Sequence, residues 1–376
     1  MVRKAPDYWM LLSVLLLLGV GILMIFSATP YVAFQQYQDS FYYIRRHLSS
    51  LGLGFFGFLF GFSLDYRFFR KYIPHFLASS FFLLLLTFIP GIGVSLGGAS
   101  RWLQIGGISF QPSELIKLAV IFFVAQAITV KKEKMQDLVM GFFPIILVVG
   151  IIALCVLAQP DLGTSLVILC TTLLMVFVGG SSFWSIFIFS LLGLRVLAWV
   201  ASRTPYQRAR LIAFVDPWQD SQGLGFHIIQ SLLAVGSGGF FGLGLGHSKQ
   251  KFAYLPQQFT DFIFAILCEE GGFVIASMVI FIFLFFIFRG FRIALKAPDR
   301  FGQILAAGIV TCLGLQVLLN ISVVLGLLPT TGIPLVFISH GGTAMVVNLF
   351  AVGILANISS FYVLEEAADN PRENTY

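Results

Sequence analysis

Charged side chains are scarce in this sequence, because Asp, Glu, Lys and Arg make up only 11% of its 376 residues. Soluble globular proteins contain roughly 25% charged residues, so these charges cannot cover a water-soluble body of this size. Scarce charge and high hydrophobicity also exclude a disordered chain. Hydrophobic residues reach 58%, including 42 phenylalanines, which indicates an integral membrane protein.

Cysteine is rare as well, and no CxxC spacing occurs. The four cysteines lie inside apolar runs, which predicts buried thiols in helices and no disulfide framework or metal site. A net charge of +6 would suggest nucleic acid as the partner of a soluble protein. In a membrane protein Lys and Arg collect in cytoplasmic loops instead, so we expect no nucleic-acid partner. The cysteines are Cys155, Cys170, Cys268 and Cys312.

A nucleotide-binding motif is missing too. The glycine-rich stretch 236–246 lacks the Gly-Lys-Ser/Thr ending of a phosphate-binding loop and does not follow a strand. Tightly packed turns explain it more simply. Any chemistry must therefore use a substrate that arrives already activated, or must be driven by a gradient.

Long apolar runs dominate what is present. A helix that crosses about 30 Å of hydrocarbon needs roughly 20 apolar residues, and a window of this length finds about ten candidates. We therefore predict an all-α, polytopic integral membrane protein that forms one domain over 1–376, with one large extracytoplasmic loop. The predicted spans lie near 9–28, 47–64, 74–92, 113–130, 140–158, 162–180, 183–201, 262–288, 302–328 and 335–362.

Basic residues predict the orientation. With ten spans both termini lie on one side, and most Lys and Arg of the short loops fall on that side. The opposite short loops hold only Arg45, Arg46 and Arg101. Both termini are therefore predicted to be cytoplasmic. The segment 202–261, between the seventh and eighth spans, would face outward, and its many apolar residues predict that it folds against the membrane.

Asp261 opens the eighth span directly after this outer loop. It could be a helix cap or an acid of the first turn, favoured by the helix dipole. It could also be a general base at the membrane boundary, where partial burial raises the pKa of a carboxylate.

Further ionisable residues lie within or beside the spans, and such residues are costly in a membrane. Glu269 and Glu270 lie about two turns deeper than Asp261, and both a structural and a catalytic role are open for them. Glu114 and Lys117 share one helix face, either as an ion pair or as the lining of a cavity.

Two other polar residues lie near the predicted outer ends of spans. Asp161 could cap the sixth helix. His340 has no second His or Cys at metal-ligand spacing, and a lone membrane histidine is more often part of a hydrogen-bonded structure.

These motifs occur together in one order. The order resembles that of the SEDS family (shape, elongation, division and sporulation), and the resemblance covers nearly the whole chain. The motifs are Gln111-Pro112-Ser113-Glu114, Gln159-Pro160-Asp161-Leu162-Gly163-Thr164, Pro205-Tyr206-Gln207-Arg208-Ala209-Arg210-Leu211, Phe214-Val215-Asp216-Pro217-Trp218, Gln230-Ser231, Thr260-Asp261-Phe262-Ile263-Phe264-Ala265, Glu269-Glu270 and Ile338-Ser339-His340-Gly341-Gly342.

The resemblance implies a peptidoglycan glycosyltransferase of the bacterial cytoplasmic membrane, which polymerises lipid II into undecaprenyl-pyrophosphate-linked glycan at the outer face. It implies a class B penicillin-binding protein and other divisome membrane proteins as partners. Asp261 would be the catalytic base, and a divalent metal such as Mg or Mn is a possible cofactor. The expected substrate-binding residues are Arg101, Glu114, Lys117, Asp161, Gln230, Ser231, Lys249, Glu269, Glu270, Ser339 and His340.

The segment 244–256 is most similar to division-type members of the family, which implies septal cell-wall synthesis. Thr331, His340 and Gly272 depart from the usual pattern of the family. An elongation-type polymerase for cell shape, a lipid II flippase and a non-catalytic scaffold are the alternatives. Secondary transporters often carry their sites at mid-membrane, whereas the ionisable residues here gather toward the outer side, which favours chemistry there.

Overall fold

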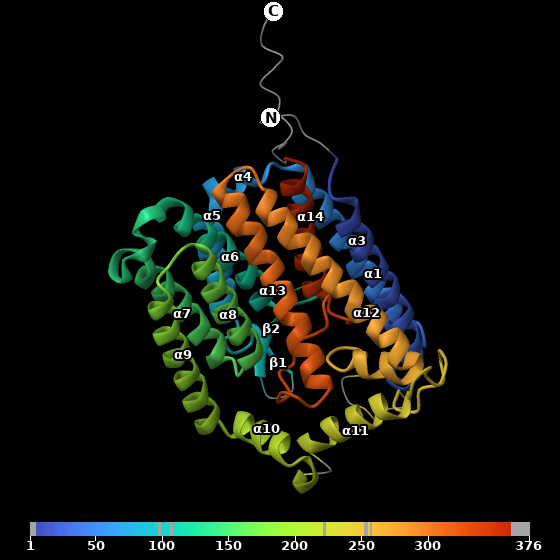
Figure 1. The fold of residues 1–376 in the computed structure, drawn as a ribbon. Helices are drawn as coiled ribbons and strands as arrows, with labels where there is room; N and C mark the ends of the chain where they lie inside the picture. Colours follow the sequence, from blue (N-terminus) through green and yellow to red (C-terminus); the bar gives the residue numbers. More distant parts are fainter. Residues whose placement is uncertain are drawn as a thin grey trace, which may run out of the picture.

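The protein is a helical bundle (Figure 1). The structure, a computed structural model, describes residues 5–361 except 97–98, 106–107, 221–222, 252–254 and 256–257. A helix lies at each of the ten predicted positions. These helices are α1 (Tyr8–Ala28), α3 (Tyr42–Ser63), α5 (Ile73–Leu86), α6 (Pro112–Lys131), α7 (Phe143–Ala158), α8 (Leu162–Val178), α9 (Phe183–Arg203), α12 (Ile263–Lys296), α13 (Arg300–Val324) and α14 (Gly342–Ser359).

Within the described residues, seven of the helical segments are individually long and apolar enough to cross a membrane. The segments Tyr42–Ser63 and Tyr66–Leu86 pass the same test only together and meet at an angle of 95°. The second includes the short helix α4 (Tyr66–Phe69) and a 3-10 turn, Arg70–Tyr72. The chain is thus a multi-pass membrane protein.

Several predicted boundaries were wrong. Helix α3 begins at Tyr42 rather than near 47, α5 ends at Leu86 rather than near 92, and α12 ends at Lys296 rather than near 288. The ninth helix ends at Val324 rather than near 328, and the last begins at Gly342 rather than near 335. Between them runs an irregular segment, 325–341, which is apolar because it is packed inside the protein and not because it is helical. Hydropathy alone cannot separate these two causes of an apolar run.

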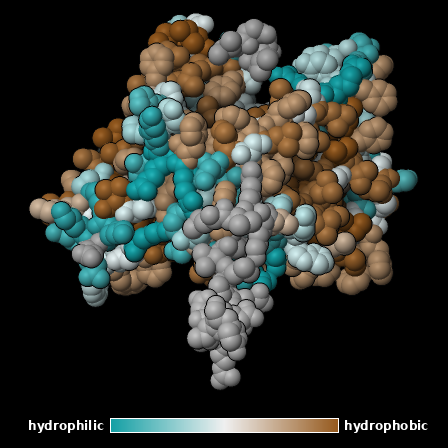
Figure 2. All heavy atoms as spheres, turned by 90° about the horizontal axis from the view of Figure 1, so that it is seen from above, coloured by the Kyte–Doolittle hydropathy of each residue, from teal (hydrophilic) through white to brown (hydrophobic). Residues whose placement is uncertain are grey.

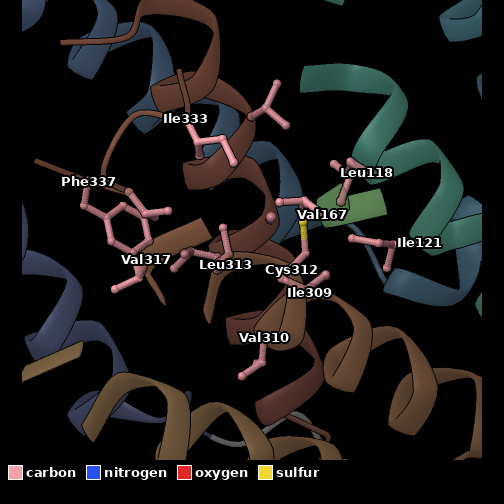
Figure 3. Packing of buried hydrophobic residues seen from close by; sticks show 14 of the residues in the cluster. Leu118, Ile121, Val167, Ile309, Val310, Cys312, Leu313, Val317, Ile333 and Phe337 are labelled. Atoms are coloured by element: carbon pink, nitrogen blue, oxygen red, sulfur yellow. The ribbon is translucent and has the colours of Figure 1, made fainter. Parts of the chain in front are cut away.

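Helix α13 lies at the centre of the bundle and contacts α12, α6, α8 and α14. Leu118 and Ile121 of α6 and Val167 of α8 pack near Ile309 and Leu313 of α13 (Figure 3). Small residues bring other helices close together, as is common in membranes. A Cβ atom on Gly61 of α3 would lie only 2.7 Å from the carbonyl oxygen of Phe350 in α14.

The end of the bundle opposite the N-terminus carries the large loop (Figure 1). As predicted, this loop is folded. It forms short elements of its own, namely α10 (Pro205–Val215), a 3-10 turn (Pro217–Asp220) and α11 (Leu224–Ser237). A small antiparallel sheet also lies here, and we did not predict it. Its strands, in the order β1-β2-β3, are Gly93–Leu96, Ala99–Ile105 and Ile108–Phe110, with Leu103 opposite Phe110.

The other end of the bundle holds ion pairs that join distant segments. Arg289 of α12 pairs with Asp7, which precedes α1, at 2.5 Å, and Arg67 pairs with Asp299 at 2.9 Å. Figure 2 looks onto this end and shows hydrophilic side chains gathered between hydrophobic ones. Along the side of the bundle, α9 exposes Phe183, Trp184 and other large apolar residues. This distribution suits a body whose sides face lipid.

The glycine-rich stretch packs against a break in α12. Gly272, inside that helix, has a φ of +67°, and a Cβ atom there would collide with the backbone nitrogen of Gly242. The break frees the carbonyl oxygens of Glu269 and Glu270, which accept the N–H groups of Leu243 and Gly244 at 3.0 Å each. The stretch therefore forms packed turns and no phosphate cradle.

Candidate active site

Asp261 lines a cavity of about 60 Å³ at the end of the bundle that carries the large loop. Three parts of the chain form its walls: helices α10 and α11, the turn before α12 together with the last turns of α13, and the segment 325–341. The lining residues are Arg210, His227, Asp261, Phe262, Asn320, Val323, Thr330, Thr331, Gly332 and Ile333.

Asp261 lies in the turn before α12 and does not cap that helix. Phe262 is the N-cap residue, and no side-chain cap hydrogen bond is formed there. Burial raises the pKa of Asp261 to about 6, although the nearby Arg210 and Arg101 act to lower it. Asp161 adds to the increase. A carboxylate with a pKa this close to neutrality is well placed to act as a general base.

Hydrogen bonds from two other parts of the chain hold the backbone around Asp261 in place. Asn320 Nδ2 donates to the Asp261 carbonyl oxygen at 2.7 Å. Ser339 Oγ donates to the Thr260 carbonyl oxygen at 2.5 Å, and the His340 N–H donates to the Phe259 carbonyl at 2.9 Å. The predicted residues Ser339, through its hydroxyl group, and His340, through its backbone N–H, thus bind carbonyl oxygens of the turn that contains Asp261.

Arg101 and Asp161, two of the predicted substrate-binding residues, lie next to Asp261. Arg101 Nε is 3.9 Å from Asp161 Oδ2, and Asp161 also caps α8 by accepting the Thr164 N–H at 3.1 Å. Gly332 lies between Arg101 and Asp261: a Cβ atom on this glycine would lie 3.7 Å from both Arg101 Nη1 and Asp261 Oδ2.

Sequence reasoning missed Arg210, His227 and Asn320 as members of the site. Arg210, on α10, donates from Nη1 to the Thr330 carbonyl oxygen at 3.0 Å and so joins the outer loop to the segment 325–341. Burial and the neighbouring Arg210 lower the pKa of His227, so its ring is neutral at pH 7. The two arginines in the short run 205–211 were the available signal for Arg210.

Glu114 and Lys117 do not line the Asp261 cavity. Lys117 Nζ donates to Glu114 Oε1 and to Gln316 Oε1, both at 2.8 Å. All three side chains border a separate cavity of about 20 Å³ between α6, α13 and α14. The ion pair and the cavity lining, which the sequence left as alternatives, are therefore both present.

Glu269 and Glu270 hold a segment of the large loop. Glu270 pairs with Lys251 at 3.2 Å and accepts a hydrogen bond from Ser27 at 2.7 Å. Glu269 accepts the Lys249 N–H at 3.0 Å and the Ser248 hydroxyl, while the Lys249 side chain is exposed. These contacts favour the structural alternative for both glutamates.

The remaining predicted residues lie outside the cavity lining. Ser231 Oγ donates to the Val324 carbonyl at 2.7 Å and ties α11 to the end of α13. Gln230, its neighbour on α11, is half-buried. The His340 ring packs against the rings of Tyr43 and His47, with centroids 5.7 and 5.8 Å away.

The side chains near Asp261 offer few ligands for a metal ion. Among the described residues, no three His, Cys, Asp or Glu side chains are grouped so that they could hold one. The charged groups nearest to Asp261 are two arginines and Asp161. A dedicated metal centre built from the described side chains alone therefore does not suit this site.

A family model described as cell cycle protein, which covers FtsW, RodA and SpoVE, matches residues 8–363. The chain belongs to this family. Two members of this family are similar to the chain over nearly their whole length. Stage V sporulation protein E of Bacillus subtilis is 41% identical, covering 96% of this chain and 98% of its own. The probable peptidoglycan glycosyltransferase FtsW of Geobacter sp. strain M18 is 40% identical, covering 95% and 98%.

Solved structures of the family share the fold. A chain from a peptidoglycan synthase complex that coordinates polymerization and crosslinking is 27% identical, with a TM-score of 0.76 over 94% of this chain and 98% of that one. The rod shape determining protein RodA of Thermus thermophilus is 25% identical, with a TM-score of 0.71 over 96% and 99%. The SEDS resemblance of the sequence is thereby confirmed.

Proposed function

We propose that this protein is a peptidoglycan glycosyltransferase that polymerises lipid II at the outer face of the bacterial cytoplasmic membrane. The observation that carries the proposal is Asp261, a carboxylate whose pKa is about 6, set in a cavity beside two arginines. The names of relatives that are about 40% identical over nearly the whole chain support it.

Asp261 removes the proton from the 4-hydroxyl group of the acceptor GlcNAc. The hydroxyl oxygen then attacks the anomeric carbon of the donor MurNAc, and a new glycosidic bond forms with inversion. The bond from this carbon to the diphosphate oxygen breaks, and its electron pair leaves with the undecaprenyl diphosphate. A positioned base of this kind contributes about 10²–10⁴-fold to the rate.

The leaving diphosphate departs as an anion, so no second carboxylic acid is needed. Arg101 and Arg210 supply positive charge near Asp261. A guanidinium group can donate two parallel hydrogen bonds to a phosphate, and such fixed donors stabilise charge that develops during the reaction. The same arginines keep the pKa of Asp261 from rising further.

The distribution of basic residues supports an outward-facing site. The pocket lies at the end of the bundle opposite the N-terminus (Figure 1). Arg67, Arg289 and Arg300 lie at the other end, where the cytoplasmic side is expected to collect Lys and Arg. Both termini are then cytoplasmic; the C-terminal tail itself lies outside the described residues.

The proposed partner is a class B penicillin-binding protein, a transpeptidase of the divisome. The similarity to a chain of a synthase complex that couples polymerization with crosslinking supports it. Relatives named FtsW support septal synthesis during division over an elongation role.

The decisive experiment is polymerisation of purified lipid II by the protein in complex with its partner. Asp261→Asn preserves shape and removes the base, so chain formation should fall by about 10²–10⁴-fold. Near-normal chains from this variant would remove Asp261 as the base. Lipid translocation without polymerisation by the unaltered complex would instead favour a flippase.

A further inference from the structure

A buried asparagine of α13 borders the same cavity as Asp261. Asn320 is 1% exposed and lines the cavity together with Arg210, Thr331 and Asp261. Buried polar side chains in proteins are almost always hydrogen-bonded. The amide nitrogen of Asn320 is hydrogen-bonded, whereas its amide oxygen has no partner among the described residues.

The amide nitrogen determines which way the side chain is turned. Nδ2 donates to the carbonyl oxygens of Asp261, at 2.7 Å, and of Ile333, at 2.8 Å. Carbonyl oxygens only accept, so both bonds require the NH₂ group, and turning the amide over would place oxygen against two oxygens. Asn320 thereby joins the turn of Asp261 to the segment 325–341 and fixes the direction of Oδ1.

The amide oxygen is buried and has no hydrogen-bond partner among the described residues. Leaving a buried acceptor unsatisfied costs free energy, and this cost is removed by any molecule that brings an O–H or N–H group to it. The reaction proposed above brings such a molecule. The acceptor GlcNAc carries free hydroxyl groups at C3 and C6, close to the reacting 4-hydroxyl.

We propose that Asn320 Oδ1 accepts a hydrogen bond from a hydroxyl of the acceptor sugar close to the one that Asp261 deprotonates. This inference rests on the proposed glycosyl transfer and assigns a specificity-determining contact within it. Two contacts, one to the base and one to the amide oxygen, orient the sugar better than one, because its rotation about the reacting hydroxyl is then restricted. Through Nδ2, the same residue positions the base.

The test compares acceptors and enzymes in pairs, with each enzyme in complex with its transpeptidase partner. A short preformed lipid-linked glycan is the donor throughout. The acceptors are lipid II and two analogues with hydrogen in place of the GlcNAc 3-hydroxyl or 6-hydroxyl. For the unaltered complex we expect one analogue to lower kcat/KM by about tenfold or more, as the loss of a partner for a buried group does.

Asn320→Ala should lower kcat/KM for lipid II and abolish the difference between lipid II and that analogue, because the partner of the missing hydroxyl is gone. Asn320→Leu, which keeps more of the volume, repeats the measurement if the alanine variant does not fold. Asn357→Ala is the matched control. It removes a buried amide at the other end of the bundle, which bonds to Tyr66 and Phe62, and it should leave the ratio between acceptors unchanged.

Two results would overturn the inference. In the first, the unaltered enzyme has the same kcat/KM for both analogues as for lipid II. In the second, the Asn320 variants discriminate between the acceptors as strongly as the unaltered enzyme does. In both cases the polymerisation of lipid II itself still supports the proposed function. Failure of the unaltered complex to polymerise lipid II would contradict that function instead.

Discussion

Arg101 Nε lies 3.9 Å from Asp161 Oδ2, and the same guanidinium donates to the carbonyl oxygens of Gln159, at 3.1 Å, and Pro160. One side chain from strand β2 therefore binds the whole turn between α7 and α8. The guanidinium also lies near Asp261, with Gly332 between the two side chains. The small sheet thus places a cation beside Asp261.

Replacing Arg101 with lysine should lower glycan synthesis by about tenfold or more, although the charge is kept. Lysine cannot reproduce the planar fork that contacts two carbonyls and a carboxylate at once. Lipid II polymerisation measures the effect. Arg45→Lys is the control, because Arg45 is largely exposed and pairs with Asp39 near the same end of the bundle. Equal activities of the two variants would contradict the role given to Arg101.

The rate of polymerisation should fall as the pH drops through about 6. Asp261 acts as a base only when ionised, and its pKa is about 6, so the rate should decrease about tenfold for each pH unit below that value. Arg210 lowers this pKa. Arg210→Gln should therefore move the midpoint of the pH profile upward, and a downward shift would contradict the assignment.

Lys117→Met should destabilise the protein by about 3–5 kcal/mol, because it leaves the Glu114 carboxylate buried without its cation. The double variant Glu114→Gln, Lys117→Met should regain most of this loss. Thermal unfolding of the purified protein measures both. If the double variant is stable and also polymerises lipid II normally, the pair is purely structural; a stable but inactive double variant assigns it a role in the reaction.

Gly272→Ala should cost at least about 2 kcal/mol, because φ is +67° and the added carbon meets the backbone of Gly242. Gly52→Ala in α3 is the matched control. Nothing lies within 4 Å of a Cβ atom at Gly52, and alanine favours a helix over glycine by about 0.5–1 kcal/mol. The melting temperature should fall for the first variant and should not fall for the second.

The positions of the ten helices could be predicted because each is a long apolar run, and burial in lipid requires such runs. The sheet could not. Its strands are only three to seven residues long, which is too short for a clear alternation of polar and apolar residues. The start of α14 was misplaced because residues 335–338 are apolar and buried against the rest of the protein, as Leu335 and Ile338 are.

Asp261 and Asp161 were predicted for the site from the motif order and the membrane boundary, and Arg101 was predicted as a cation for the leaving pyrophosphate. Asn320 and Arg210 were missed for different reasons. Asn320 is one amide in an apolar span, and only its two carbonyl partners mark it as special. Arg210 lies in a long loop, and its contact with Thr330 joins residues 120 positions apart, which local patterns cannot predict.

The Asp261 cavity measures about 60 Å³, which is room for a few water molecules and not for a disaccharide. A disaccharide therefore does not fit in this cavity in the described conformation. The hydrogen bond from Arg210 to Thr330 joins helix α10 to the segment 325–341, and residues of both line the cavity. Under the proposed function these two walls would have to move apart when a sugar enters, and the apparent affinity for the substrate would then be the intrinsic affinity reduced by the fraction of molecules in which they are apart.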